Sequence, residues 1–245
     1  MALAITELTR GWDSTDVTGP SAYTIPSTTP GSGSGVIVLY CSREATTAPT
    51  LTPTNTFGGT WVQLGGAAQI DGISGIGGWY IPSANGSAST ISMAVPAAVV
   101  NIGMAYSVLE VTGHNAAGLV VTVVYGPTGT TSATLGLAAS APALADANNG
   151  QIFWGGCRAN QAITAEAGWT AGTGANGTNP NFGSKVEWKI AGFDSSPTMT
   201  QTSARWQSMY IEVAIAPAGG GGYTGLWVPA MRRNHLGSMQ AFGRA

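Results

Sequence analysis

Three groups of residues have types and spacing that could support chemistry, and the first is a glycine-rich run. Residues 172–177, Gly-Thr-Gly-Ala-Asn-Gly, satisfy the G-x-G-x-x-G pattern of dinucleotide-binding loops. That pattern works only where a helix follows, because the helix N-terminus receives the pyrophosphate. Asn179-Pro180-Asn181 comes next and leaves no place for a helix to start. We therefore expect a turn-rich loop here, and no cofactor.

Paired carboxylates form the second group, because two acids across a cleft can hydrolyse a glycosidic bond. Glu187 and Glu212 lie on different predicted strands, where they could face each other. Glu187, however, stands between Lys185 and Lys189 in an alternating segment, which favours an outward, solvated trio. Glu110 and Glu212 each interrupt an apolar run and are interpreted as edge residues. The sequence therefore predicts no catalytic pair and no enzyme.

Histidine and cysteine form the third group. His114 would need a Ser or Cys on a constrained turn to act as a base, and the chain has no G-x-S-x-G elbow. His114 is therefore interpreted as a loop residue, and its distance along the chain from His235 argues against a zinc site. Cys41 and Cys157 each end an apolar run, so we expect two buried free thiols, with a disulfide between neighbouring strands as the alternative.

The eight tryptophans divide by position. Core packing accounts for the five on predicted strands, which are Trp61, Trp79, Trp154, Trp188 and Trp206. The other three, Trp12, Trp169 and Trp227, lie in predicted loops or near the C-terminus. An exposed loop tryptophan can stack on a sugar, so Trp169, Asn176 and Asn179 are candidate glycan contacts. For Trp169 itself, packing into the core is the favoured interpretation and the glycan contact is the alternative.

Charge is sparse and unevenly distributed. Charged residues make up 8% of the 245, against roughly 25% in average soluble domains. Three of the nine basic residues, Arg232, Arg233 and Arg244, lie in the last fourteen positions, beyond the glycine run 219–222. The rest of the chain is acidic and has no basic stripe, so nucleic acid is not an expected partner. No apolar run is long enough to cross a membrane, and no signal peptide is expected.

The pattern of apolar and polar residues predicts that strands position these side chains. Residues 36–41, Val-Ile-Val-Leu-Tyr-Cys, form a continuous apolar run that predicts a strand buried on both faces, and residues 151–157 predict a second. Asn85-Gly86 predicts a type I′ turn ahead of a strand at residues 90–95. Residues 126–129 are expected to close a hairpin, and residues 170–183 to form a long loop. Roughly ten to twelve strands without an amphipathic helix indicate an all-β, antiparallel, jelly-roll-like β-sandwich.

Several of these segments together resemble a β-sandwich family found in minor tail and other virion proteins of tailed bacteriophages. The matching segments run from the central strand 36–41 through Gly-Gly-Thr-Trp-Val-Gln-Leu (58–64), Gly-Trp-Tyr-Ile (78–81), Thr-Ile-Ser-Met (90–93), Tyr-Ser-Val-Leu-Glu-Val-Thr-Gly (106–113), Asn-Gly-Gln-Ile-Phe-Trp-Gly-Gly (149–156) and Gly-Trp (168–169). The resemblance covers about residues 30–217. It implies a structural or surface-binding role and transfers no catalytic residue.

The chain is accordingly divided into an N-terminal segment (1–29) that packs on the sandwich or on a neighbour, a sandwich (30–217), and a Gly-hinged C-terminal arm (218–245). The arm is expected to dock onto another virion subunit, with its apolar side chains buried there and its arginines paired to acids. Its docking residues are Leu226, Trp227, Met231, Arg232, Arg233 and Phe242.

The predicted function is a structural tail or capsid-decorating protein of a tailed bacteriophage, located in the virion after assembly in the host cytoplasm. Its expected partners are other virion subunits and further copies of itself. The alternative is a carbohydrate-binding module that recognises host surface glycans. No metal or cofactor is expected, and neither nucleic acid nor a membrane is an expected partner.

Overall fold

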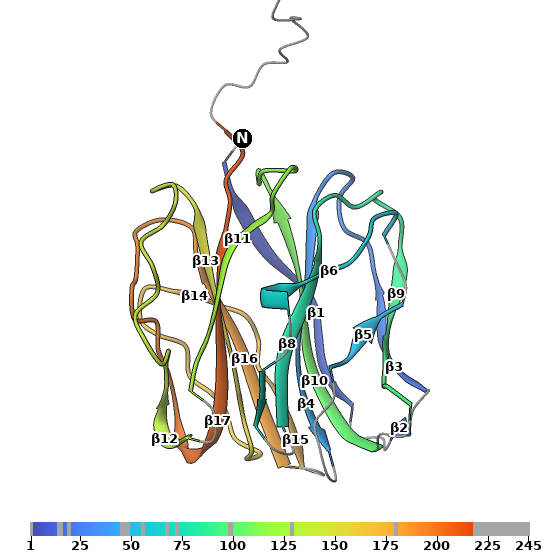
Figure 1. The fold of residues 1–245 in the computed structure, drawn as a ribbon, viewed down its shortest axis with the longest axis vertical. Helices are drawn as coiled ribbons and strands as arrows, with labels where there is room; N and C mark the ends of the chain where they lie inside the picture. Colours follow the sequence, from blue (N-terminus) through green and yellow to red (C-terminus); the bar gives the residue numbers. More distant parts are fainter. Residues whose placement is uncertain are drawn as a thin grey trace, which may run out of the picture.

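The computed structural model describes residues 2–13, 17–18, 21–44, 50–54, 57–66, 69–71, 74–97, 100–127, 130–178 and 181–217. Within these ranges the chain forms strands β1 to β17, all paired antiparallel, and one short 3-10 turn, η1 (Leu64–Gly66). The predicted all-β antiparallel sandwich is confirmed. Its strands lie in three layers, shown side by side in Figure 1.

The middle layer, here called the central sheet, has the spatial order β1 (Ala4–Asp13), β10 (Val100–Thr112), β4 (Gly35–Glu44), β8 (Ser74–Ile81), β6 (Val62–Gln63), with β2 (Val17–Thr18) beside β10 and β7 (Gln69–Asp71) beside β8. The large outer sheet has the order β11 (Val120–Tyr125), β17 (Met199–Val213), β13 (Gly150–Cys157), β16 (Asn181–Lys189), β14 (Thr170–Ala171), with β12 (Thr130–Leu135) beside β17 and β15 (Ala175–Thr178) beside β16. The small outer sheet contains β3 (Ala22–Thr28), β9 (Ser89–Ala94) and β5 (Thr52–Pro53).

Burial on both faces explains the unbroken apolar run of β4. Its odd-numbered residues from 37 to 41 pack against the large outer sheet, and its even-numbered residues from 36 to 40 pack against the small one. All six side chains are fully buried. A strand with water on one face would alternate apolar and polar residues instead. The predicted central strand is therefore confirmed, and so is the second one, because every residue of β13 is buried.

Loops cover the outer face of the large outer sheet. Phe153, Tyr210 and Trp206 point outward from the strands and pack with Ile163 and Trp169, which come from the covering loops. We call this side of the sheet the loop-covered face. It has its own apolar core, so β13 and β16 are shielded from water on both faces although only one face meets another sheet.

Two segments predicted as loops are arranged differently in the structure. β11 and β12 both pair with β17, β11 along residues 209–213 and β12 along 199–206, so they are successive parts of one edge strand. The predicted hairpin at residues 126–129 is therefore wrong, because a hairpin would pair its two arms with each other. Likewise, β14 and β15 both pair with β16 and form one interrupted edge strand. The predicted long loop at 170–183 is therefore wrong.

The chain bends at Asn85-Gly86, but the predicted type I′ turn between paired strands is not formed. Gly86 has a φ of 80°, and the Asn85 Oδ1 atom accepts a hydrogen bond from the Ser87 backbone nitrogen (2.9 Å). The strands on either side, β8 and β9, belong to different sheets. This bend therefore carries the chain from the central sheet to the small outer sheet.

The β-sandwich, called the body from here on, starts and finishes (residues 2 and 217) close to Gly113. This residue has a φ of 68°, and a side chain there would collide with the Ala2 carbonyl group. On the other side, the Ala216 nitrogen donates to the Gly113 carbonyl oxygen (2.8 Å), and the Asn115 nitrogen donates to Ala214 (2.9 Å). We call the end of the body around Gly113 the terminal end. β1 and β3, which come from the predicted N-terminal segment, are strands of two of the sheets, so these residues are part of the sandwich itself.

Candidate functional site

Glu187 is the first candidate acid, and the structure buries it completely. Its Oε2 atom accepts a hydrogen bond from the Glu166 nitrogen (2.7 Å), and its Oε1 atom is buried without a partner. Burial raises the pKa of this carboxyl to about 8. The prediction of an outward, solvated residue is therefore wrong. Alternation along β16 does separate two faces, but loops cover the face that was expected to meet water.

Glu212 and Glu110 also have structural roles. Glu212 is buried on β17, inside the large outer sheet, and its Oε1 atom accepts from the Ala145 nitrogen (2.7 Å) and from Asn149 Nδ2 (2.6 Å). Glu110 lies on β10, between β1 and β4, and accepts from the Gly31 nitrogen (2.6 Å). Neither is on an edge strand, so that prediction is wrong. Both carboxylates bind backbone or amide groups of nearby loops and hold those loops against the sheets.

His114 lies outside the named strands, between β10 and β11, and is buried there. Its Nε2 atom donates to the Pro82 carbonyl oxygen (2.6 Å), because a carbonyl can only accept, while Nδ1 is buried without a partner. Cys41 and Cys157 are free, buried thiols whose pKa is raised by burial, as predicted. Among the described residues, no group of three His, Cys, Asp or Glu side chains could hold a metal ion.

Trp169 packs into the loop-covered face. Its exposed fraction is 8%, its Nε1 atom donates to Asp194 Oδ2 (3.2 Å), and Lys189 Nζ lies 5.9 Å from the ring centroid. A sugar needs a bare ring face for stacking, and this ring is covered. The structure thus favours the core-packing interpretation of Trp169.

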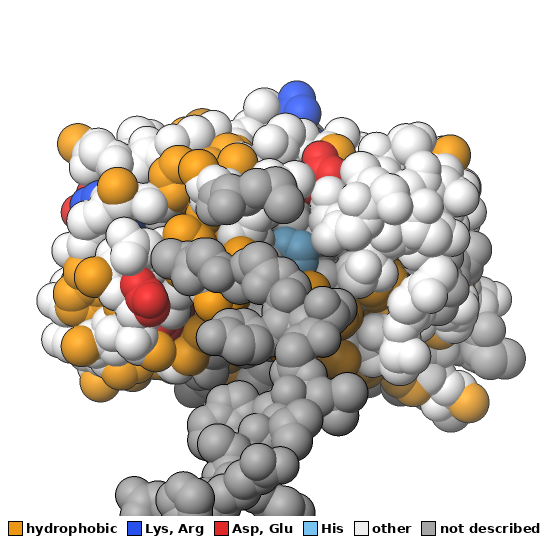
Figure 2. Space-filling model, turned by 90° about the horizontal axis from the view of Figure 1, so that it is seen from above, with side chains coloured by type: hydrophobic (Ala, Val, Ile, Leu, Met, Phe, Trp, Pro, Cys, Tyr) orange, Lys and Arg blue, Asp and Glu red, His pale blue; other side chains and the backbone are white. Residues whose placement is uncertain are grey.

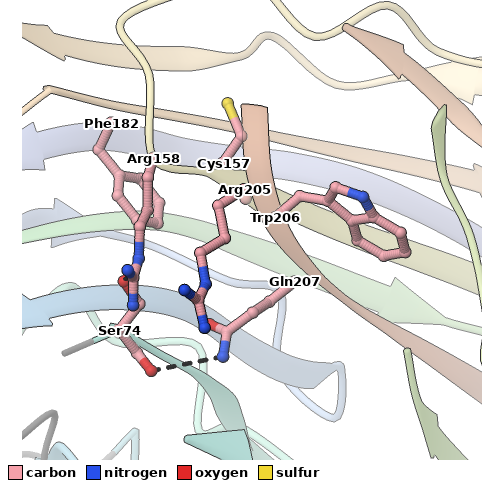
Figure 3. A pocket seen from close by; sticks show the side chains of 8 residues that line it. Ser74, Cys157, Arg158, Phe182, Arg205, Trp206 and Gln207 are labelled. Carbon is pink, nitrogen blue, oxygen red and sulfur yellow. Dashed lines mark hydrogen bonds between the residues drawn. The ribbon is translucent and has the colours of Figure 1, made fainter. Parts of the chain in front are cut away.

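Figure 3 shows a narrow pocket where β8 meets the large outer sheet, at the end of the body opposite the terminal end. Arg158, just after the end of β13, and Arg205, within β17, extend toward Ser74, and Arg158 Nε donates to Ser74 Oγ (2.6 Å). Gln207 Nε2 donates to the Ser74 carbonyl oxygen (3.3 Å). These side chains leave no volume that could hold a water molecule, so this pocket joins two sheets and does not accommodate a ligand.

A larger opening lies along the seam, which is the side of the sandwich where edge strand β1 runs beside β15. The groove there has a volume of about 520 Å³ and is lined by residues 8–12 and 174–176. Ligand sites commonly fall between roughly 300 and 1,000 Å³. We call it the seam groove. Asn176, one of the predicted glycan contacts, is exposed in its wall.

A β-bulge decides which side chains reach this groove. β1 pairs Glu7 with Leu109 but Thr9 with Val108, so Leu8 is an extra residue. Opposed residues of an antiparallel pair point to the same face. Beyond the bulge, Arg10 and Trp12 therefore share the face of Ser107 and Ala105, which is the face directed at the large outer sheet. Without the extra residue, this stretch of β1 would turn its other side chains toward the seam.

Two contacts close the seam at the ends of the groove. At one end Glu7 accepts hydrogen bonds from Ser107 Oγ (2.8 Å) on the central sheet and from the Thr173 nitrogen (2.8 Å) on the other side. At the other end the Trp12 ring stacks on Phe182, with centroids 5.4 Å apart and planes 10° from parallel. The indole also lies against Gly177, where any side chain would collide with it. The groove is thus a bounded space between two bridges.

Glu7, Arg10 and Trp12 were not predicted from the sequence as residues of a functional site. Large apolar side chains alternate with Ala4 and Thr6 at Leu3 and Ile5, which indicates a strand, but the bulge at Leu8 interrupts the pattern just before Arg10 and Trp12. Trp12 was assigned to a loop and is a strand residue. The run 172–177 was expected to be a loop and instead contributes β15 and one wall of the groove.

The remaining predicted site residues lie outside the described part of the chain. These are Asn179 and the whole docking set, Leu226, Trp227, Met231, Arg232, Arg233 and Phe242. Within the described residues, no helix is both long and apolar enough to cross a membrane.

No family model, no curated protein and no solved structure matches this chain. The resemblance of residues 30–217 to a bacteriophage virion family therefore stays a prediction. What the structure itself supplies is the β-sandwich, the positions of its two ends and the seam groove.

Proposed function

We propose that this protein is a structural subunit of a tailed-bacteriophage virion, held in the particle by its C-terminal arm while the β body faces outward. The observation that carries the proposal is the meeting of both body ends at Gly113. Because the described body finishes at Pro217 on this end, the arm starts there. Attachment at the terminal end leaves the seam and the opposite end free for display.

The surface of the terminal end suits contact with a neighbouring subunit. Figure 2 looks onto this end and shows mostly apolar and uncharged polar side chains, with few charges among the described residues. A sparsely charged surface gives little electrostatic repulsion between subunits. It also costs less to desolvate than a charged one. This surface would pack beside the arm when the subunit docks.

The polar groups of the body also favour a structural role. The carboxylates of Glu187, Glu212 and Glu7 each accept hydrogen bonds that hold loops or sheets together. A general acid or base needs a proton-transfer atom that faces a substrate. These acids instead face the backbone of their own chain, so their placement serves the fold.

Complementation of a phage that lacks this gene tests the proposal. Full-length chain should be recovered in purified particles, whereas a chain ending at Pro217 should fold and stay out of them. Trp227→Ala in the full chain should lower incorporation as well. Arg205→Gln, which changes one charge at the opposite end of the body, is the matched control and should be incorporated normally. Normal incorporation of the truncated chain would refute arm docking.

A second candidate function, recognition of a host surface glycan, is favoured by the seam groove. Hydroxyl-rich sugars require hydrogen-bonding groups beside an apolar surface, and Thr9, Asn176 and the half-buried Trp12 line this groove. The site proposed for the glycan is thus the seam, with Asn176 retained from the predicted contacts. Binding of the full chain to a glycan array tests this candidate, with Asn176→Ala as the variant expected to lose signal.

A further inference from the structure

We propose that the seam groove selects saccharides that carry a carboxylate, with Arg10 pairing to that group. This inference rests on the glycan-binding candidate and specifies its ligand class. Among the residues lining the groove, all of them described, Arg10 alone carries a charge. It stands out because the chain as a whole has a net charge of −2. A single cation in a neutral groove, on an otherwise acidic body, favours an anionic ligand.

The two described acids of β1, Glu7 and Asp13, are not among the residues that line the groove. Glu7 lies at its closed end with both carboxylate oxygens already accepting hydrogen bonds, one from Ser107 and one from Thr173. Asp13 follows Trp12 on β1 but pairs with Met104, so it points to the opposite face of the central sheet. The exposed guanidinium of Arg10 therefore faces the groove with no carboxylate beside it in the lining.

Arginine suits a sugar carboxylate in this position. Its planar guanidinium can make two parallel hydrogen bonds to one carboxylate, which fixes orientation as well as charge. Arg10 reaches the groove from a strand, not from a loop, and its neighbour Trp12 is held by the stack on Phe182. A site on a strand beside a fixed ring holds its geometry without a ligand, which lowers the entropic cost of binding.

The shape and lining favour a linear saccharide over a peptide. The groove runs between two edge strands, and an extended peptide could pair with either edge. Such a peptide would need apolar recesses for alternate side chains. Leu8 packs against the core between the central sheet and the small outer sheet, and Trp12 presents only the part of its ring that Phe182 and Gly177 leave accessible. The rest of the lining offers mainly hydroxyl, amide and backbone groups. Those groups match the hydroxyls of a sugar chain.

An array of linear oligosaccharides tests this selectivity, with every uronic-acid chain paired to its methyl ester. The ester keeps the sugar backbone and removes the charge, so the pair isolates the contribution of Arg10. We expect the full-length protein to bind at least one acid about tenfold more tightly than its ester, as measured by titration calorimetry of the hits. Equal affinity for acid and ester would overturn the inference, and so would the absence of binding to any acid.

Two variants and one control complete the experiment. Arg10→Gln should reduce binding of the acid to the level of the ester, and Asn176→Ala should weaken both members of the pair. Arg205→Gln removes the same charge from a surface outside the groove and should change neither. An acid preference that survives Arg10→Gln would also overturn the inference.

The outcomes separate this inference from the functions on which it builds. Tight binding of neutral chains without acid preference would support glycan recognition and refute the carboxylate contact. Incorporation into particles depends on the arm, so loss of glycan binding in Arg10→Gln should leave the amount of protein per particle unchanged.

Discussion

An aromatic ring, an acid and a cation come together at two places in this protein, the loop-covered face and the seam. At the loop-covered face, the ring of Trp169 is 8% exposed, Glu187 is fully buried, and Lys189 Nζ lies 5.9 Å from the centre of the ring. The acid there has lost contact with water, and its pKa rises to about 8. All three groups contribute to packing.

At the seam the same side-chain types remain partly accessible. Trp12 is half-buried, Arg10 is exposed, and Glu7 joins two sheets while leaving a groove of about 520 Å³ beside it. The difference follows from what lies above each site. Loops with their own apolar residues cover the first, whereas the second is the open side between two edge strands. Residue type alone therefore does not distinguish a binding site from a core.

The largest expected effect is at the loop-covered face. Trp169→Ala should lower the free energy of unfolding by about 3–5 kcal/mol, because it removes a buried ring and leaves a cavity. The loss is measured by urea unfolding followed through the intrinsic fluorescence of the other tryptophans. Trp169→Phe retains most of the packing and should lose less. A change below about 1 kcal/mol in Trp169→Ala would mean that the ring is not part of the core.

At the seam, the same truncation should cost less. Trp12→Ala removes a half-buried ring, so less apolar area returns to water on unfolding. If Trp12→Ala were the more destabilising of the two, the contrast between a buried and an accessible tryptophan would fail.

Glu187 provides the second test, through the pH dependence of stability. Its pKa is raised from 4.5 to about 8 by burial, so the folded state holds the proton more tightly than the unfolded chain. The native protein keeps the associated stability below about pH 4.5 and loses it progressively as the pH rises through 8. Glu187→Gln cannot ionise and should lack this dependence, with a difference on the order of a few kcal/mol between pH 5 and pH 9.

Urea unfolding at several pH values measures this difference, with Glu7→Gln at the seam as the control. The Glu7 carboxylate accepts two hydrogen bonds and is half-buried, so its replacement should not remove the loss of stability above pH 5. A native protein whose stability is flat between pH 5 and pH 9 would contradict the buried, protonated state of Glu187.

The parts of the fold that were predictable from the sequence are those whose burial is determined within the strand itself. The run 36–41 has no polar position, so both of its faces must be covered whichever elements provide the cover. Gly86 takes a positive φ where the chain bends, which a local pattern can indicate. The antiparallel sandwich and the free thiols were predictable for similar reasons.

The parts that were not predictable depend on segments distant in sequence. The period-2 pattern of residues 185–190 separates two faces correctly, but it cannot show that loops return to cover the face of Glu187. At β1, a single inserted residue, Leu8, moves Arg10 and Trp12 to the face toward the seam. Amino-acid composition does not identify a bulge, so the seam groove and the position of Arg10 in it could not be predicted without the pairing of the strands.

The third expected effect concerns closure of the seam. Glu7→Ala removes the acceptor of two hydrogen bonds, one from Ser107 within the central sheet and one from the Thr173 nitrogen across the seam, and should cost about 2 kcal/mol of unfolding free energy. Ser107→Ala removes only one donor and should cost less. A double-mutant cycle measures their coupling, because the Ser107 contribution should vanish once Glu7 is absent. Additive losses would show that the two residues do not act together.

The smallest expected effect separates the two cations. Arg10→Gln should change the unfolding free energy by less than about 0.5 kcal/mol, because an exposed side chain away from the core contributes little. Lys189→Gln should cost about 0.5–1 kcal/mol, because it removes the charge held near the Trp169 ring. Urea unfolding of both variants at one pH measures the difference. If replacing Arg10 leaves stability unchanged, its guanidinium has no structural partner and is available to bind a ligand. A large loss of stability in Arg10→Gln would instead show that Arg10 has a structural role, and it would argue against the seam groove as the binding site.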